Sequence, residues 1–350
     1  MTKIRKITII FFIAIILFSI YVLYISITDY KPDEIILLPI YNNQAKTISK
    51  DEKLEITIFN LGYGGSGQVE RGFKALENKS GSSKKEDVID NLEGIVNVID
   101  EINPDFLLLQ ELDTNSCRSF RINQLSYLND KYPNYCSVYG KNYDVTWVPF
   151  PFFKVQRKIE SGISIFSKYF ATDAYRYSLP GQEDGFHKFF DYDRSFVEMR
   201  FDLGNGQELV IINLHLSDFN DIGLERQHEL RYLQDYLKEE RAQGSYIIVG
   251  GDWNHNLPGS DPSYLNIKQK EWPAFLKNLP EEFKVDGFDW VIDAYVPTVK
   301  FKNKRENNDF FAIIDGFLVS DNIEIQKVFA FDDGFKVSNH NPVTIEFILR

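Results

Sequence analysis

The chain has 350 residues, 43% of them hydrophobic, and its 51 acidic residues against 39 Lys and Arg give a formal net charge of −12. This composition supplies a substantial core and argues against long disordered regions, and the lack of a basic stripe argues against tight non-specific binding of DNA. A phosphate substrate at a metal site stays compatible with the acidity, because a bound cation supplies positive charge locally.

The first 28 residues predict a membrane anchor. A basic flank of Lys3, Arg5 and Lys6 precedes an uncharged apolar stretch over residues 7–28, which is long enough to span a bilayer. By the positive-inside rule, tail 1–6 stays cytoplasmic and the rest of the chain lies outside. The alternative is a cleaved signal peptide. We favour the anchor, because a signal peptide normally has a shorter apolar region and a small-x-small site, to which Ser26-Ile27-Thr28 is a poor match.

The remainder divides into a linker over residues 29–50 and one folded domain over residues 51–350. The linker contains two prolines and is expected to be a tether with at most one short extended piece. In an extracellular domain, Cys117 and Cys136 can form one disulfide if the fold brings them together, but they do not have the spacing of metal ligands.

Within the domain, apolar runs of strand length alternate with segments of helical periodicity. We expect strands at residues 54–60, 106–111, 161–167, 196–201, 208–216, 245–252, 310–320 and 343–348. We expect helices within residues 86–102, 116–132 and 225–243. The aromatic segment 143–153 is expected to be a surface loop or rim, and residues 175–193 to be irregular.

Several of these strands end on, or contain, polar side chains of catalytic types. The clearest example is the run 245–251, which ends in two glycines before Asp252 and Asn254. Together these residues are Asn60, Glu111, His215, Asp252, Asn254, Asp315 and His340. If the strands are neighbours, one cleft gathers oxygen ligands for a hard cation, a His that can pair with an Asp, and amides for a phosphate. Hydrolysis of a phosphate ester calls for this combination.

The order and spacing of these motifs resemble the endonuclease/exonuclease/phosphatase superfamily, which includes DNase I-like nucleases, inositol polyphosphate phosphatases and bacterial sphingomyelinases. The resemblance covers residues 51–350 and rests on Asn60, Gln110-Glu111, Asn213-Leu-His215, Gly251-Asp252-Trp-Asn254, Ile314-Asp315 and Ser338-Asn-His340-Asn-Pro. It implies a four-layered α/β sandwich, in which two mixed sheets pack face to face and helices cover the outside.

The resemblance also implies a metal site. Glu111 is expected to bind Mg²⁺, with Mn²⁺ or Ca²⁺ as alternatives, and Asn60 to lie near the metal or the phosphate. The family usually has Asp before its final His, where this chain has Asn339. Asn339 keeps an oxygen ligand but lacks the charge, which weakens any metal bound there and leaves a degenerate enzyme as an alternative.

The catalytic roles follow from the same resemblance. Asp252 and Asn254 are expected to orient the attacking water and the scissile phosphate. His340, hydrogen-bonded by Asp315, contacts the phosphate or exchanges its proton, and His215 is a second donor beside the phosphate. An Asp partner fixes the tautomer of a His and favours its charged form.

Each of these residues also has a structural interpretation that the sequence alone leaves open. Glu111 can be a solvated cap at the end of a strand, His340 a turn residue and His215 a buried, satisfied core residue. Arg194 can contact phosphate or form a surface salt bridge.

The expected function is therefore Mg²⁺-dependent hydrolysis of a phosphate ester at the outer membrane face. The acidity and the anchor favour a phosphodiesterase acting on lipid head groups or small phosphodiesters. An extracellular nuclease acting on nucleic acid is the first alternative, and a surface binding protein that has lost turnover is the second. The sequence indicates no protein partner.

Overall fold

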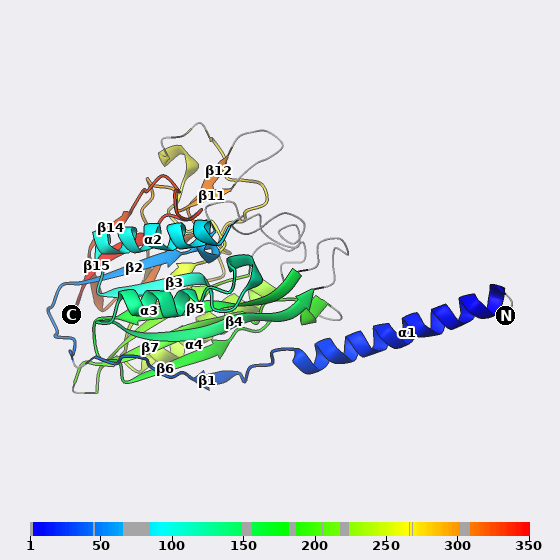
Figure 1. Ribbon diagram of the computed structural model, residues 1–350. Coiled ribbons are helices and arrows are strands. Elements are labelled where there is room, and N and C mark those ends of the chain that lie inside the picture. Colours follow the sequence, from blue (N-terminus) through cyan, green and yellow to red (C-terminus); the bar gives the residue numbers. More distant parts are fainter. Residues whose placement is uncertain are drawn as a thin grey trace.

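The computed structural model describes residues 3–44, 46–65, 84–148, 156–181, 187–204, 206–217, 224–265, 267, 269–301 and 309–350. Residues 62–85 and 142–157, loops in which we expect the substrate to be selected, lie partly outside these ranges. The described part contains two large β-sheets that pack face to face (Figure 1).

The first sheet has six strands in the order β14-β15-β2-β3-β5-β4. They are β2 (Leu54–Asn60), β3 (Phe106–Asp113), β4 (Cys136–Val148), β5 (Gln156–Ser167), β14 (Ile323–Ala330) and β15 (Val343–Leu349). β2 and β3 are parallel, and the other neighbours are antiparallel. The parallel register pairs Asn60 with Gln110, which brings Asn60 and Glu111 to the same edge of the sheet.

The second sheet has seven strands in the order β1-β6-β7-β8-β9-β13-β10. They are β1 (Ile35–Leu37), β6 (Asp173–Ser178), β7 (Ser195–Asp202), β8 (Glu208–His215), β9 (Tyr246–Asp252), β10 (Phe288–Val291) and β13 (Asp315–Ser320). Only β8 and β9 are parallel among these neighbours. A separate two-stranded sheet joins β11 (Val299–Phe301) to β12 (Phe310–Ala312).

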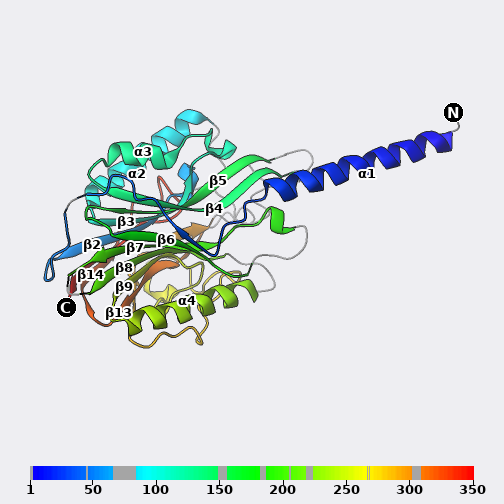
Figure 2. The ribbon, with the colours of Figure 1, turned by 90° about the horizontal axis from the view of Figure 1, so that it is seen from below.

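Three helices cover the outer faces of the two sheets: α2 (Lys85–Ile102), α3 (Gln124–Lys131) and α4 (Leu224–Ala242). α2 and α3 lie over the six-stranded sheet, and α4 lies over the seven-stranded sheet (Figure 2). Short 3₁₀ turns complete the described helical structure: η1 (Gly62–Gly64), η2 (Cys117–Ser119), η3 (His187–Phe189) and η4 (Pro262–Tyr264).

The strand sequences explain the layering. In β3, Leu107 and Leu109 pack against α2 and α3, whereas Leu108 points into the core between the sheets with Ile211 and Ile248. Successive side chains of a strand face opposite ways, so a strand buried on both faces has an unbroken apolar run. The expected four-layered α/β sandwich of two mixed sheets flanked by helices is therefore confirmed.

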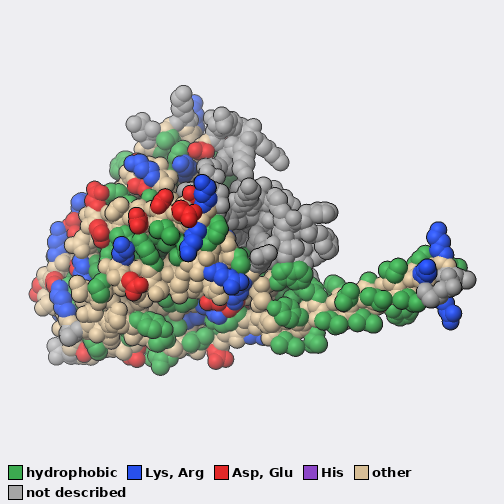
Figure 3. Space-filling model, in the orientation of Figure 1, with side chains coloured by type: hydrophobic (Ala, Val, Ile, Leu, Met, Phe, Trp, Pro, Cys, Tyr) green, Lys and Arg blue, Asp and Glu red, His purple; other side chains and the backbone are tan. Residues whose placement is uncertain are grey.

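The amino-terminal helix α1 (Lys3–Thr28) extends away from the sandwich, and apolar side chains cover its exposed length (Figure 3). It is long and apolar enough to cross a membrane. Residues 29–50, expected to be a tether, lie against the domain: β1 pairs with β6, and Leu38 and Ile48 are buried in the core between the sheets.

Several segments differ from the sequence expectation. The aromatic segment from Tyr143 onward belongs to β4 as far as Val148, because Tyr143 and Val145 alternate inward, and residues 149–155 lie outside the described ranges. The irregular segment 175–193 begins inside β6. The single strand expected at 310–320 is two strands separated by Ile313 and Ile314, and β10, β11 and β14 were not expected. Cys117 and Cys136 are both free thiols.

Candidate active site

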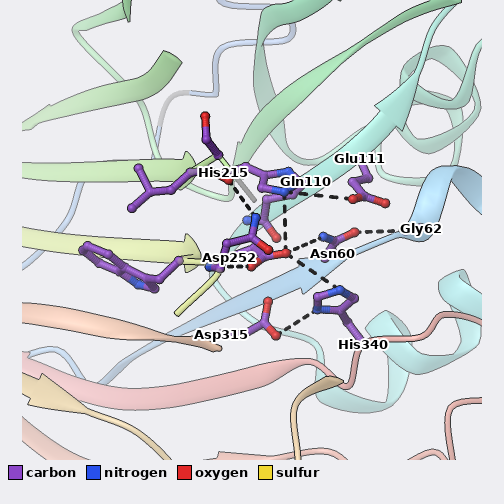
Figure 4. A network of polar contacts seen from close by, with 12 residues as sticks. Asn60, Gly62, Gln110, Glu111, His215, Asp252, Asp315 and His340 are labelled. Carbon is purple, nitrogen blue, oxygen red and sulfur yellow. Dashed lines mark hydrogen bonds and ion pairs between the residues drawn. The ribbon is translucent and has the colours of Figure 1, made fainter. Parts of the chain in front are cut away.

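The carboxylate of Asp252 lies at the centre of a polar cluster where the catalytic edges of the two sheets meet (Figure 4). Asp252 is the last residue of β9, and its cross-strand partners are His215 at the end of β8 and Asp315 at the start of β13. The seven-stranded sheet therefore supplies three of the expected residues in adjacent register positions. Asn60 and Glu111 come from the facing sheet, and His340 comes from the segment before β15.

Asp252 is fully buried and held on both oxygens. The Asn60 amide donates to Oδ2 at 3.0 Å, and the backbone N–H of Asn254 donates to Oδ1 at 2.9 Å. Asn60 is itself fixed, because its side-chain oxygen accepts from the Gly62 N–H at 3.0 Å. A buried carboxylate that accepts several hydrogen bonds has a fixed orientation, which suits a group that positions water or substrate.

Two histidines approach the same oxygen of Asp252. His340 Nε2 lies 3.8 Å from Oδ2, and His215 Nε2 lies 3.6 Å from it. The other ring nitrogen of His340, Nδ1, lies 2.9 Å from Asp315 Oδ2, so the carboxylate fixes the ring and selects the tautomer with a proton on Nδ1. The expected Asp315–His340 pair is present, and its Nε2 faces the cleft.

Glu111 sits at an irregularity in β3. Its φ is +54°, in the left-handed region that residues with a Cβ seldom adopt, and the register with β5 shifts between Leu109 and Leu112. Such a bulge re-aims a side chain at a sheet edge, and strained positions of this kind cluster at functional sites. The result is that Glu111 Oε1 lies 4.0 Å from His215 Nε2.

Glycine is required beside Asp252. Gly251 has φ +150°, and a Cβ at this position would lie 2.0 Å from the carbonyl oxygen of Leu214 on β8. No real Cβ tolerates that approach, so only glycine allows β8 and β9 to pair up to their ends. The two glycines that end the apolar run thereby bring His215 beside Asp252.

The two sheets are joined by buried amides. Gln110 on β3 donates to the side-chain oxygen of Asn213 on β8 at 2.6 Å, and Asn213 donates to the carbonyl oxygens of Leu109 and Ser164 at 2.9 Å. These bonds fix the separation between Glu111, which follows Gln110, and His215, which follows Asn213 by two. Gln110 and Asn213 therefore support the site from behind it.

Sequence reasoning missed several supporting residues. The Thr298 hydroxyl accepts from the backbone N–H groups of Ile314 and Asp315 at 3.0 and 3.1 Å and so anchors the start of β13. The Ser338 hydroxyl donates to the carbonyl oxygen of Asn60 at 2.7 Å, which ties the His340 segment to β2. Ser338 belongs to the motif around His340, whereas Thr298 has no periodic or motif signal.

A wall of aromatic and cationic side chains adjoins Glu111. The hydroxyls of Tyr63 and Tyr192 lie 3.0 Å apart, the Arg118 guanidinium stacks 3.3 Å from the Tyr63 ring, and Arg194 lies 4.1 Å from the Tyr192 ring. Burial raises the pKa of Tyr63 well above its usual range, and the Glu111 charge raises it further. Burial also raises the pKa of Tyr192, so both phenols stay protonated. This wall was not expected from the sequence.

The remaining expected residues have distinct surroundings. Asn254, with φ +52°, donates from its side chain to the carbonyl oxygen of Leu216 at 2.7 Å, and it contacts Asp252 through its backbone. Arg194 donates to the carbonyl oxygen of His215 at 3.3 Å and is buried rather than on the surface. Asn339 is buried near the Gly62 turn, and its Oδ1 has no hydrogen-bond partner among the described residues.

The donor set fits a divalent cation. Carboxylate oxygens of Glu111 and Asp252 lie within 4.0 Å of His215 Nε2, and hard cations prefer such oxygens. The buried Oδ1 of Asn339 is a further acceptor without a hydrogen-bond donor among the residues the structure describes. Ligand atoms of Asp252, Asp315 and His340 also lie within 4.8 Å of one another. A cation among those three would compete for the close Asp315–His340 hydrogen bond, so we regard the Glu111 side as the better position.

A family model described as "Endonuclease/Exonuclease/phosphatase family" matches residues 71–340. This match covers most of the chain and includes all of the site residues expected from the sequence except Asn60. The chain belongs to this family, whose members are metal-dependent phosphoester hydrolases, and it is an enzyme of that class. No curated protein sequence matches the chain.

Solved structures share the fold at low sequence identity. An endonuclease/exonuclease/phosphatase from Beutenbergia cavernae has a TM-score of 0.56 at 14% identity, over 85% of this chain and 72% of that one. D. rerio TDP2, solved with a single-strand DNA product, has 0.54 at 14% identity, over 85% and 99%. The human nocturnin catalytic domain, solved with bound sulfate, has 0.53 at 13% identity, over 89% and 98%. These similarities support the fold and do not select a substrate.

Proposed function

We propose that the protein is a divalent-cation-dependent phosphodiesterase that acts at the extracellular face of the membrane. The observation that carries this proposal is the convergence of His215, His340 and Asn60 on the Asp252 carboxylate, with Asp315 behind His340 and Glu111 beside His215. The anchor α1, with Lys3, Arg5 and Lys6 at its amino end, supports the assignment to the membrane and the outward orientation of the domain.

Glu111 is proposed as the main ligand of the cation, with oxygen atoms of Asn60 and Asn339 close by. When bound, a divalent cation such as Mg²⁺, or Mn²⁺ or Ca²⁺ in its place, neutralises phosphate charge and polarises the ester. Asp252 is proposed to accept a hydrogen bond from the attacking water and so aim it at phosphorus. The Asn60 and Asn254 bonds to Asp252 keep that carboxylate in place.

The two histidines are proposed to donate hydrogen bonds or protons to oxygen atoms of the phosphate. With Nδ1–H held by Asp315, His340 presents Nε2 to the cleft and donates from it when the ring is protonated. His215 presents Nε2 from the opposite side and is proposed as a second donor to a phosphate oxygen. Two donors on one phosphate suit a diester, whose transition state gathers negative charge on its oxygens.

The test is hydrolysis of bis(p-nitrophenyl) phosphate by the full chain in detergent, with Mg²⁺ and with EDTA. We expect turnover that needs metal and that falls by about 10³-fold in His340→Ala, because a positioned proton donor contributes 10²–10⁴-fold. His228→Ala is the matched control, since His228 is exposed on α4. Equal, negligible rates in Mg²⁺, in EDTA and in His340→Ala would contradict the proposal for this substrate.

The competing function is a surface protein that binds a ligand but has lost turnover. It is suggested by Asn339, which stands where the family usually has Asp. Asn339→Asp restores the charge that the family usually has there. A phosphodiesterase that already turns over gains at most a few-fold from this change, through tighter metal binding. A protein that has lost turnover would instead change from inactive to active. An assay with supercoiled DNA, run beside the small diester, distinguishes an extracellular nuclease from the phosphodiesterase and from the protein without turnover.

A further inference from the structure

The backbone beside the candidate cation ligands has an uncommon conformation in two places. Glu111 has φ +54° at the bulge in β3. The three residues of η1 (Gly62–Gly64), the turn that follows Asn60, have φ values of +54°, +58° and +65°. The middle residue of this turn is Tyr63, whose Cβ makes the left-handed region unfavourable. Such conformations persist only where the surrounding contacts enforce them, so we looked for the groups that hold both segments.

The turn η1 lies directly against the site. Gly62 donates its N–H to Asn60 Oδ1 at 3.0 Å (Figure 4). A Cβ at Gly62 would lie 3.2 Å from Oδ1 of Asn339, so the turn also packs against the second amide that is proposed to lie near the cation. A displacement of η1 would therefore move the side chain of Asn60 relative to Glu111.

One buried amide connects η1 to the segment that follows Glu111. Gln124, the first residue of α3, is fully buried. Its Oε1 accepts from the backbone N–H of Asp113 at 2.9 Å, and its Nε2 donates to the backbone carbonyl of Tyr63 at 2.7 Å. Asp113 lies two residues beyond Glu111, and Tyr63 lies in the middle of η1. The amide of Gln124 therefore sets the separation between the two segments.

The turn is packed closely on this amide. A Cβ at Gly64 would lie 2.8 Å from Gln124 Nε2 and would push the amide away from the carbonyl of Tyr63. Gly64 also has a φ of +65°, which glycine adopts without a steric cost. Glycine at this position thus leaves room for the hydrogen bond between Gln124 and η1.

Arg118 makes a second connection between the same two segments. Its guanidinium donates from Nη2 to Asp113 Oδ1 at 2.8 Å and from Nε to Oδ2 at 3.0 Å, and it lies 3.3 Å from the centre of the Tyr63 ring. A guanidinium that is paired through two bonds and stacked on a ring has little freedom to rotate. Asp113 is therefore tied to η1 twice, by Gln124 through its backbone and by Arg118 through its side chain.

The bulge is also fixed on the side that precedes Glu111. The carbonyl oxygen of Gln110 accepts from the backbone N–H of Leu61 at 3.0 Å, and the Gln110 side chain donates to Asn213 at 2.6 Å. Glu111 thus projects from a short segment whose two ends are both held, one by β2 and β8 and the other by Gln124.

We propose that Gln124, assisted by Arg118, is a positioning residue for the cation, because it sets the separation between the Glu111 carboxylate and the side chain of Asn60. A divalent cation needs its oxygen ligands at about 2.0–2.6 Å, so a small displacement of either segment weakens binding. Substitution of residues that orient metal ligands typically changes metal affinity by about 10–100-fold. This role rests on the proposed cation site at Glu111.

The test is a titration of the full chain in detergent with Mn²⁺, in which electron paramagnetic resonance measures the free ion. Gln124→Met keeps a side chain of similar length but loses both hydrogen bonds, and we expect the Kd for Mn²⁺ to rise roughly 10-fold. Gln234→Met is the matched control. The Gln234 amide on α4 also donates to a backbone carbonyl, that of Lys284 at 2.6 Å. Its loss should leave the Kd within about two-fold, because distant sites act independently. Unchanged affinity in Gln124→Met would overturn the positioning role.

Gln124→Glu covers the case in which the methionine variant does not fold. Glutamate keeps the shape of the side chain and the acceptor for the Asp113 N–H, but its carboxylate has no donor for the Tyr63 carbonyl. We expect weaker Mn²⁺ binding in this variant too, and wild-type affinity in folded Gln124→Glu would contradict the proposal.

A second readout distinguishes misplaced ligands from a general loss of stability. The water-proton relaxation rate per bound Mn²⁺ increases with the number of water molecules on the ion. We expect this rate to rise in both Gln124 variants, because water replaces a protein oxygen that no longer reaches the ion. Weaker binding with an unchanged rate would indicate destabilisation alone and would overturn the positioning role. Absence of Mn²⁺ binding in wild type would instead overturn the cation site itself.

Discussion

Two clusters of buried charge, one on each side of the seven-stranded sheet, show how a structural ion network differs from a catalytic one. Behind the sheet, under α4, Arg200 donates to Glu198, Glu208 and Glu240 at 2.6–2.8 Å. In the cleft, the Asp252 carboxylate meets Asn60, a backbone N–H and two histidines at 2.9–3.8 Å. In the first cluster the positive charge is a side chain of the protein, the Arg200 guanidinium.

The chemistry of the partners explains the contrast. A guanidinium is always charged and fits carboxylates with its fixed fork of donors, so the Arg200 cluster is complete at every ordinary pH. Burial raises the pKa of Glu198 despite the charge of Arg200, which limits the net negative charge of that cluster. Histidines change their charge near neutral pH, and carboxylates gathered with them can accept a divalent cation. The cleft is therefore built to exchange protons and ligands.

The largest expected effect is a loss of turnover when the carboxylate at the centre of the cleft is replaced. Asp252→Asn should lower kcat/KM for the diester by about 10³–10⁴-fold, because the carboxylate that aims the water becomes an amide. The free energy of unfolding should change by no more than about 1 kcal/mol, since the side chain keeps its shape. Both are measured on the same preparation, by turnover and by urea unfolding followed by tryptophan fluorescence. Retained turnover would place the attacking water elsewhere.

A substitution in the Arg200 cluster should have the opposite outcome, a loss of stability without a loss of turnover. Arg200→Met should lower the free energy of unfolding by about 3–5 kcal/mol, because it leaves three carboxylates without their buried partner. Turnover per folded molecule should stay within about two-fold. Arg241→Met is the control, since its ion pair with Asp321 is largely exposed and is worth about 0–1 kcal/mol. A large loss of turnover in folded Arg200→Met would mean that the two clusters are coupled through the sheet.

A third change tests whether Asp315 and His340 act as one unit. Asp315→Asn should lower turnover by about 10²-fold, because the ring loses the acceptor that fixes its tautomer. In the double variant with His340→Ala, the loss should equal that of His340→Ala alone, since residues that act together are not additive. A double variant whose loss is the product of the two single losses would show that Asp315 has an independent role.

The smallest effect concerns the phenols beside Glu111. The pKa of Tyr63 is raised in the folded chain, so its contribution to stability is complete below the unfolded pKa of about 10 and is lost as the pH rises toward the folded value. Wild type should therefore lose about 1 kcal/mol more than Tyr63→Phe between pH 8 and pH 11, at about 1.36 kcal/mol per unit. The comparison is made by urea unfolding, with the exposed Tyr264→Phe as control. Identical losses in wild type and Tyr63→Phe would contradict the burial argument.

The layers were predicted from the resemblance to a known superfamily, whereas the strand patterns indicated the main cleft residues. Each of Asn60, His215 and Asp252 terminates an apolar run, so locating the runs locates the residues. Their assembly around one carboxylate is the finding that the structure adds. It depends on the parallel pairing of β8 with β9 and on a sheet contact that no local pattern encodes.

Other features were beyond sequence reasoning for physical reasons. Nothing in the residues 106–113 indicates that Glu111 adopts a left-handed conformation, because bulges arise from pairing with β5. β4 was mistaken for a loop because its alternation, with Tyr143 and Val145 inward, runs into a Pro- and Phe-rich segment. Tyr63 and Tyr192 are far apart in sequence and meet only through packing.

The most direct test of the account is where the cation binds. Electron paramagnetic resonance of Mn²⁺ with the full chain in detergent measures free and bound metal without needing a substrate. We expect one cleft site that is lost in Glu111→Gln and retained in both His340→Ala and His228→Ala. Binding that survives Glu111→Gln but is lost in His340→Ala would place the cation between Asp252, Asp315 and His340. That result would contradict the proposal that His340, hydrogen-bonded to Asp315, donates a proton to the phosphate.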